Sequence, residues 1–200
     1  MVEIRWHGRG GQGAKTAALL LADIAFEAGL YVQGFPEYGP ERMGAPITAY
    51  NRLDDEPIRI HSNIYEPDMV VIVDETLVSA VDVTKGLKPG GNIIVNTKRD
   101  PALVAARFEE VDAEVYAVDA ADISLRALGK NLPNTPLLSV VSKLTGIIGE
   151  TKFYEAMETA FSEKFRDNPT IVQGNMNAVR EAWNGAVHVN ESRTVDKDRV

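Results

Sequence analysis

The 200-residue sequence contains no cysteine. This absence excludes disulfides, thiolate metal sites and cysteine-ligated iron–sulfur clusters within the chain. Its three histidines, His7, His61 and His188, do not follow any metal-ligand spacing. A Gly-x-Ser-x-Gly motif is also missing, and no histidine is part of a recognisable nucleophile–base pattern. We therefore predict no catalytic residue and no metal ligand in this chain.

Basic residues are fewer than acidic ones, with 21 Lys and Arg against 29 Asp and Glu, which gives a formal net charge of −8. Nucleic-acid binding needs a basic surface, so this balance argues against a nucleic-acid partner. Long apolar runs are missing too, and the amino terminus has a strand pattern rather than that of a signal peptide. We expect no membrane segment and a cytoplasmic location.

Hydrophobic residues make up 44% of the sequence and charged residues 25%, as in ordinary globular proteins. The order of apolar runs and turns predicts an α/β fold, a three-layer sandwich with a mixed, mostly parallel sheet and a helical carboxyl-terminal third. We expect one domain over 1–189, followed by a charged tail over 190–200. Apolar runs predict strands over 2–7, 30–32, 69–73, 92–96 and 114–118.

Helix signals follow several of these strands. Good helix formers over 14–28 end at Gly29, and a helix before Gly129 ends in the same way. Asp74 or Thr76 is expected to cap a short helix over 77–81. Between these elements, the runs 47–52 and 57–61 have a hairpin signature, which would add antiparallel strands to the sheet.

The most informative motif is the glycine-rich stretch that follows the first strand. Gly8, Gly10 and Gly13 match G-x-G-x-x-G between a strand and a helix, where unpaired N–H groups and the helix dipole favour an anion. The alternative is a tight turn with no ligand. A P-loop is excluded because Ala14 separates Gly13 from the lysine. The candidate phosphate-binding residues are Gly8, Gly10, Gly11, Gln12, Gly13, Lys15 and Thr16.

A second unusual stretch, 34–46, is rich in glycine and proline and cannot form a regular helix. A long loop in a compact domain usually has a function or contacts a partner, although a structural crossover is an alternative. We select Glu37, Tyr38, Glu41 and Arg42 as candidate contacts to a partner or a substrate channel. Arg42 could instead pair internally with Glu37 or Glu41.

Together these two stretches resemble signatures of a known family, the gamma subunits of 2-oxoacid:ferredoxin oxidoreductases. The first match is Ile4-Arg5-Trp6-His7-Gly8-Arg9-Gly10-Gly11-Gln12-Gly13, and the second runs from Phe35 to Pro46. Weaker matches are Asn134-Thr135-Pro136-Leu137-Leu138 and Asn175-Met176-Asn177-Ala178. The resemblance covers nearly the whole chain in order.

The resemblance implies a multi-subunit enzyme that converts a 2-oxoacid, most simply pyruvate, and CoA to acetyl-CoA, CO2 and reduced ferredoxin. It places thiamine diphosphate, Mg and [4Fe-4S] clusters on partner subunits of alpha, beta and delta type, and no cofactor on this chain alone. Coenzyme A would bind at the interface, where the glycine loop would contact a phosphate or a partner subunit. The isolated chain would be inactive.

Two other functions remain open from the sequence. The glycine pattern is compatible with a freestanding NAD(P)-binding oxidoreductase, for which Glu37 would have to serve as the ribose-binding acid. The chain could also be a purely structural scaffold subunit whose glycine turn meets no ligand.

Overall fold

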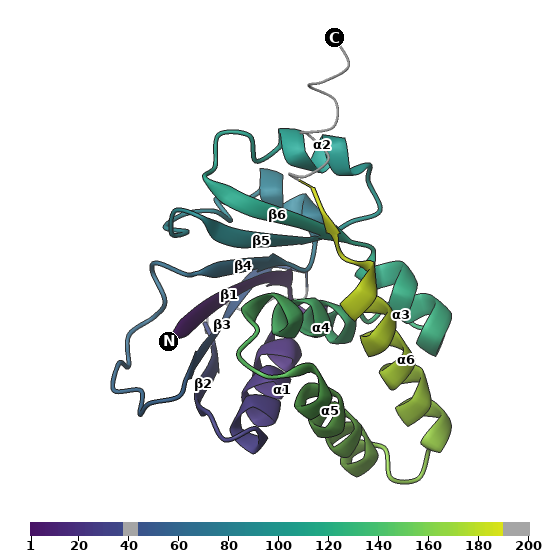
Figure 1. Cartoon of the computed structure of the whole chain (residues 1–200). Coiled ribbons are helices and arrows are strands. Elements are labelled where there is room, and N and C mark those ends of the chain that lie inside the picture. The colour runs from purple at the N-terminus through teal and green to yellow at the C-terminus, as the bar shows by residue number, and fades with distance from the viewer. Residues whose placement is uncertain (38–43, 190–200) are drawn as a thin grey trace.

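The computed structural model describes residues 1–37 and 44–189 (Figure 1). At its centre is a seven-stranded sheet in the order β2-β3-β1-β4-β5-β6-β7. The pairs β1–β4, β4–β5 and β5–β6 are parallel, and the other three pairs are antiparallel. Only β3 and β7 in this sheet therefore oppose the common direction, which confirms the mixed, mostly parallel sheet. The strands are β1 (Val2–Arg9), β2 (Tyr31–Pro36), β3 (Pro46–Asp54), β4 (Met69–Ile72), β5 (Gly91–Asn96), β6 (Ala113–Val118) and β7 (Val187–His188).

The antiparallel strands differ from those that the sequence predicts. Residues 57–61 form no strand, so the expected hairpin with 47–52 is wrong. The reason is topological, because β3 already pairs with β1 along one edge and with β2 along the other. The strands β1 and β2 do run in the same direction, as a parallel crossover requires, but β3 lies between them.

Helices cover the two faces of the sheet unequally (Figure 1). The large apolar core lies under α1, α3, α4, α5 and α6, whereas η1 and α2 pack on the other face. This arrangement gives the three layers that the sequence predicts, one of them thin. The helices are α1 (Ala14–Glu27), η1 (Glu75–Ser79, a 3-10 helix), α2 (Pro101–Ala106), α3 (Ala120–Leu128), α4 (Asn134–Thr145), α5 (Glu150–Lys164) and α6 (Pro169–Gly185).

Helix α1 is fixed to the sheet by close packing and by buried hydrogen bonds. A Cβ added at Gly34 of β2 would lie 2.9 Å from the Cβ of Ala22, so strand and helix approach closely only because residue 34 is glycine. Trp6 Nε1 donates to Asn51 Oδ1, and Asn51 Nδ2 donates to the carbonyl of Ala18. These bonds satisfy buried polar groups and fix the position at which α1 begins beside β1.

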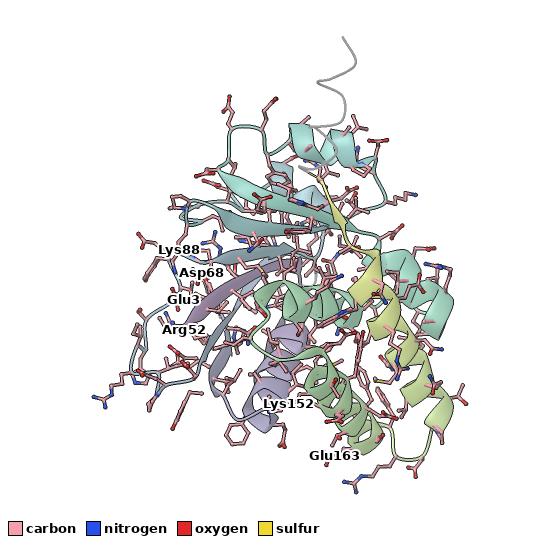
Figure 2. The ribbon with its side chains drawn as sticks, viewed as in Figure 1. Glu3, Arg52, Asp68, Lys88, Lys152 and Glu163 are labelled. Atoms are coloured by element: carbon pink, nitrogen blue, oxygen red, sulfur yellow. The ribbon has the colours of Figure 1, made fainter. Side chains whose placement is uncertain are left out.

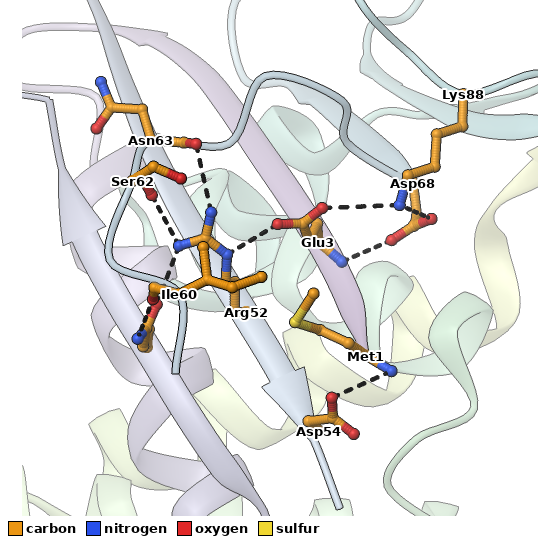
Figure 3. Close-up of polar contacts among 10 residues, drawn as sticks. Met1, Glu3, Arg52, Asp54, Ile60, Ser62, Asn63, Asp68 and Lys88 are labelled. Atoms are coloured by element: carbon orange, nitrogen blue, oxygen red, sulfur yellow. Dashed lines mark hydrogen bonds and ion pairs between the residues drawn. The ribbon is translucent and has the colours of Figure 1, made fainter. Parts of the chain in front are cut away.

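A buried arginine ties an irregular loop to the other face of β3 (Figure 3). The Arg52 side chain is almost fully buried, and its Nε lies 2.8 Å from Glu3 Oε1. Its Nη atoms donate to Gln33 Oε1 and to the carbonyls of Ser62 and Asn63. One guanidinium therefore joins β1, β2, β3 and the loop that follows β3.

Within the described ranges, no helix combines the length and the apolar character needed to cross a membrane. The division into one domain and a charged tail stays a prediction, and residues 190–200 lie outside the described residues.

Candidate functional site

The glycine loop connects β1 to α1 at the carboxyl edge of the parallel strands. Gly11 and Gly13 have φ values of +95° and +85°, which a residue with a Cβ rarely adopts. Gly8 is required for a different reason, because its Cβ would lie 2.9 Å from the Cβ of Ala14. The N–H of Gly10 donates to the carbonyl of Ala45. Backbone conformation and packing thus account for the glycine pattern at this turn.

A polar network holds the loop against the end of β4. Gln12 Oε1 accepts from the N–H of Arg9, and Gln12 Nε2 donates to Asp74 Oδ2 over 2.6 Å. Arg9 donates to Thr76 Oγ1 and lies 3.3 Å from Asp74. Burial alone would raise the pKa of Asp74, but hydrogen bonds from Thr76 and Gln12 and the charge of Arg9 lower it. Asp74 also caps η1 through the N–H of Thr76, as the sequence predicts.

Beside this network lies an open cleft of about 430 Å³ at the carboxyl ends of β4, β5 and β6. Open α/β sheets bind their ligands at this edge. Gly11 and Gln12 form one wall. The remaining lining residues come from the segments after β4, β5 and β6 and from the start of α4, namely Val73, Asp74, Glu75, Asn96, Thr97, Lys98, Asp119, Ala121, Asn131 and Pro133.

The carboxylates of the cleft are all held by partners in the chain, as described above for Asp74. Glu75 accepts from Thr97 Oγ1 and pairs with Arg99 at 3.0 Å. Asp119 accepts from an N–H of the first turn of α3 as its N-cap. Lys98 is exposed on the wall and forms no ion pair with another described residue. Two of the three carboxylates are thus paired with arginines, whereas Asp119 is held by a backbone N–H alone.

Two helix amino termini meet at this cleft without side-chain caps. The N-cap of α1 is Gly13 and the N-cap of α4 is Pro133, and neither provides a capping hydrogen bond. Neither helix has an acidic residue in its first turn. A Cβ at Gly13 would lie 3.0 Å from Asn134 Cγ, which shows how closely the two helices begin. Uncapped N–H groups and two dipole ends favour an anion here.

The structure separates residues that the sequence placed in one phosphate site. Gly11 and Gln12 line the cleft, while Gly8 and Gly13 shape its wall. Lys15 and Thr16 instead line a groove between α1 and α5. The sequence did not identify Lys98 or the start of α4 as part of the site. Their only signal is position, because Lys98 lies two residues after the end of β5.

The second predicted group is described only in part. Glu37 follows β2, and its carboxylate accepts a hydrogen bond from Tyr50 Oη over 2.7 Å. Burial, with a smaller contribution from Glu37, raises the pKa of Tyr50. Tyr38, Glu41 and Arg42 lie outside the described residues, so their predicted contacts stay predictions.

A buried basic pair lies on β1, which leads to the loop. Arg5 Nε donates to His7 Nε2 over 3.0 Å, and Arg5 also donates to the carbonyls of Val83 and Lys85. Burial, and then the charge of Arg5, lower the pKa of His7 to about 4. His7 is therefore neutral at pH 7 and accepts a hydrogen bond from a permanent cation.

The described cleft offers binding groups rather than a catalytic pair. No histidine, serine or tyrosine is among its described lining residues. Across residues 1–37 and 44–189, no three His, Cys, Asp or Glu side chains form a group that could hold a metal ion.

The chain matches known proteins over almost its full length. A family model, pyruvate ferredoxin/flavodoxin oxidoreductase, matches residues 3–184. The common gamma subunit of the pyruvate/ketoisovalerate oxidoreductases of Thermococcus litoralis is 48% identical over 187 residues, which is 94% of this chain and 98% of the relative. Pyruvate synthase subunit PorC of Thermotoga maritima is 43% identical and covers 90% and 92% of the two chains.

Solved structures agree with these relatives. The crystal structure of pyruvate oxidoreductase subunit PORC from Thermotoga maritima has a TM-score of 0.80 at 39% identity, covering 93% of this chain and 97% of that one. A 2-oxoglutarate:ferredoxin oxidoreductase from Magnetococcus marinus has a TM-score of 0.66 at 18% identity, covering 90% of this chain and 30% of that one, and shows the fold alone. The chain therefore belongs to the pyruvate ferredoxin/flavodoxin oxidoreductase family, as a gamma-type subunit of the oxidoreductase complex.

Proposed function

We propose that this gamma-type subunit supplies the wall that binds a phosphate group of coenzyme A in an oxidoreductase that acts on pyruvate. The complex would combine pyruvate and CoA to give acetyl-CoA and CO2 and would pass electrons to ferredoxin. Partner subunits of alpha, beta and delta type would hold thiamine diphosphate, Mg and [4Fe-4S] clusters, since this chain has no cysteine for a cluster. A cytoplasmic location stays part of the proposal.

The observation that carries the proposal is the meeting of two uncapped helix amino termini beside Lys98. Each terminus presents N–H groups and a partial positive charge, and the lysine adds a mobile full charge. Gly11 brings the backbone to the cleft without a side chain in the way. A phosphate fits such a site because it accepts several hydrogen bonds at once and remains charged at neutral pH.

Two further points support coenzyme A as the anion. The Magnetococcus marinus enzyme, part of which has the same fold, was solved with 2-oxoglutarate, coenzyme A and succinyl-CoA bound. The carboxyl edge of a parallel sheet, where the cleft lies, is also where nucleotide-like ligands bind in α/β proteins. We therefore assign the glycine loop a contact to a phosphate group and no part in electron transfer.

The geometry gives the dinucleotide alternative less support. A dinucleotide-binding fold places its ribose-binding acid on the strand after the first crossover helix, next to the first strand. Here β3 separates β2 from β1, and the carboxylate of Glu37 is held by Tyr50. The scaffold alternative remains an outcome of the experiment below.

The test is steady-state kinetics of the assembled complex containing the Lys98→Ala variant. Loss of one charged hydrogen bond costs about 1.5–3 kcal/mol, so we expect the KM for CoA to rise roughly tenfold or more. The KM for pyruvate should stay unchanged. Lys85→Ala is the matched control, because Lys85 is an exposed lysine away from the cleft. An unchanged KM for CoA in Lys98→Ala would favour a scaffold.

A further inference from the structure

The carboxylates of the cleft oppose the binding of an anion there. Asp74, Glu75 and Asp119 are among its described lining residues, and Lys98 is the one basic residue among them. Like charges repel each other, and the repulsion is strongest where the groups are partly removed from water. A cleft that binds a phosphate group therefore needs a way to offset its own carboxylates.

Arg9 places a positive charge next to Asp74 without lining the cleft itself. Its Nε lies 3.3 Å from Asp74 Oδ2, the oxygen that also accepts a hydrogen bond from Gln12. The side chain of Arg9 is 29% exposed and that of Asp74 is 14% exposed, so the pair is only partly hydrated. Arg9 is not among the described lining residues, so its guanidinium reaches Asp74 from outside the cleft.

Two uncharged oxygen atoms hold the guanidinium of Arg9 in this position. Its Nη2 donates to Thr76 Oγ1 over 2.8 Å, and its Nη1 donates to the carbonyl of Gly44 over 3.1 Å. Within the described residues, Asp74 is the one carboxylate that forms an ion pair with Arg9. The positive charge of Arg9 is therefore directed at a single carboxylate, which belongs to the cleft.

Asp74 carries a negative charge at neutral pH, so this offset matters. Burial alone would raise the pKa of Asp74, but hydrogen bonds from Thr76 and Gln12 and the charge of Arg9 bring it below its usual value. The hydrogen bonds to Thr76 and Gln12 remain when Arg9 is replaced, so the carboxylate should stay ionised. Loss of the arginine would then leave an uncompensated negative charge on the wall of the cleft.

A similar ion pair at the other end of the sheet provides a comparison. Lys88 Nζ lies 2.7 Å from Asp68 Oδ1, and the two residues come just before β5 and β4 (Figure 2). This pair is thus at the amino ends of the parallel strands, whereas the cleft is at their carboxyl ends. Neither residue is among the described lining residues of the cleft.

We propose that Arg9 is a positioning residue for coenzyme A, whose charge offsets that of Asp74 and so allows a phosphate group to enter the cleft. Arg9 acts through Asp74 and does not itself contact CoA. The inference rests on the proposed function, because it takes the anion to be CoA. Arg99 has the same relation to Glu75, at 3.0 Å, but its side chain is 54% exposed, so water already screens more of that charge.

Two substitutions of Arg9 separate its charge from its hydrogen bonds. Arg9→Gln removes the charge, whereas Arg9→Lys keeps the charge and loses the planar fork that contacts Thr76 and Gly44 together. In the assembled complex, we expect the KM for CoA to rise about fivefold in Arg9→Gln, as for one charge repelling an anion in a partly hydrated site, and to change less than about twofold in Arg9→Lys. The kcat and the KM for pyruvate should not change in either variant. Arg9 is partly exposed, so folding should persist, and circular dichroism checks that it does.

Ionic strength provides a second measurement, which a purely structural role of Arg9 would not affect. Salt screens repulsion between charges, so the ratio of the KM for CoA in Arg9→Gln to that of the unaltered complex should fall between about 0.05 M and about 0.5 M NaCl. Lys88→Gln is the matched control, because it also removes one positive charge and one ion pair from the chain. Its KM for CoA should equal that of the unaltered complex at both salt concentrations.

The results that would overturn the inference are distinct from those that would overturn the proposed function. An equal rise of the KM for CoA in Arg9→Gln and Arg9→Lys would show that Arg9 has a structural role only. If Lys98→Ala raises the KM for CoA and Arg9→Gln does not, this inference alone is wrong. If Lys98→Ala leaves the KM for CoA unchanged, the proposed function is wrong, and the inference with it.

Discussion

Replacing Arg52 by methionine should destabilise the fold strongly, although the side chain is remote from the cleft. The substitution keeps a long apolar side chain and removes the guanidinium, which is the partner of Glu3, Gln33 and the carbonyls of Ser62 and Asn63. Arg52 is 1% exposed, so water cannot easily replace these bonds. The expected loss is therefore that of breaking a buried ion pair.

The magnitude follows from what the substitution leaves behind. Removing one member of a buried pair costs about 3–5 kcal/mol, because the remaining charge stays buried without its partner. Glu3 is not left entirely alone, since Lys88 Nζ lies 3.7 Å from its second oxygen and is itself held by Asp68 (Figure 3). We therefore expect a loss of about 3 kcal/mol, at the lower limit of that range, which corresponds to a fall in Tm of roughly 6–12 °C for a chain of this size.

Urea unfolding of the purified chain measures this loss, with the fluorescence of the two buried tryptophans, Trp6 and Trp183, as the signal. Arg59→Met is the matched control, since Arg59 is exposed and has no ion pair within the described residues. Its free energy of unfolding should change by no more than about 0.5 kcal/mol. If Arg52→Met lost less than about 1 kcal/mol, the network would be hydrated and the reasoning from burial would be refuted.

Two further predictions concern β1. Gly8→Ala should lower the free energy of unfolding by about 1–3 kcal/mol because its Cβ would meet Ala14. Gly149→Ala should leave that free energy almost unchanged, since Gly149 has open space around it. Equal losses of the two variants in thermal melts would contradict the packing argument. His7 has a folded-state pKa of about 4 against an ordinary value of 6.5, so the unfolded chain binds the extra proton and stability falls between pH 6.5 and pH 4, by about 3 kcal/mol from this group. The free energy of unfolding, taken from denaturation curves across that pH range, should depend on pH much less in His7→Gln. A pH dependence that persists in this variant would show that other groups cause it.

Local signals in the sequence predict much of the fold. Helix α1 begins and ends within one residue of its predicted limits, because Gly13 and Gly29 have the left-handed backbone that ends regular structure. The buried strands β4 and β5 are correct for a similar reason, since a short apolar run between turns fits few other structures. The last third is helical, as predicted, and forms α4, α5 and α6, which contribute apolar residues to the large core.

The errors concern pairing between distant segments. The two-residue strand β7 and the short helix α2 carry too few residues to show a period, and the sequence did not predict them. The hairpin at 57–61 is wrong because local β-propensity does not reveal that both edges of β3 are already occupied by β1 and β2. Strand order is a property of the whole sheet, so no single segment determines it.

The candidate site shows the same limit. The glycine loop is visible in the sequence because its conformation demands glycine. Lys98 and the start of α4 are not visible, since only the topology brings the ends of β1, β5 and the segment before α4 to one cleft. Lys15 was grouped with the loop by its nearness in sequence, but on α1 it lies on the groove instead.

The most direct test of the central claim is to purify this chain from its native host and assay both the preparation and the isolated chain for pyruvate- and CoA-dependent reduction of ferredoxin. We expect the chain to co-purify with cysteine-rich and thiamine-diphosphate-binding partners and with this activity, and we expect the isolated chain to be inert and to bind no thiamine diphosphate. Recovery of a lone chain that is active by itself, or that binds NADH tightly, would contradict the account.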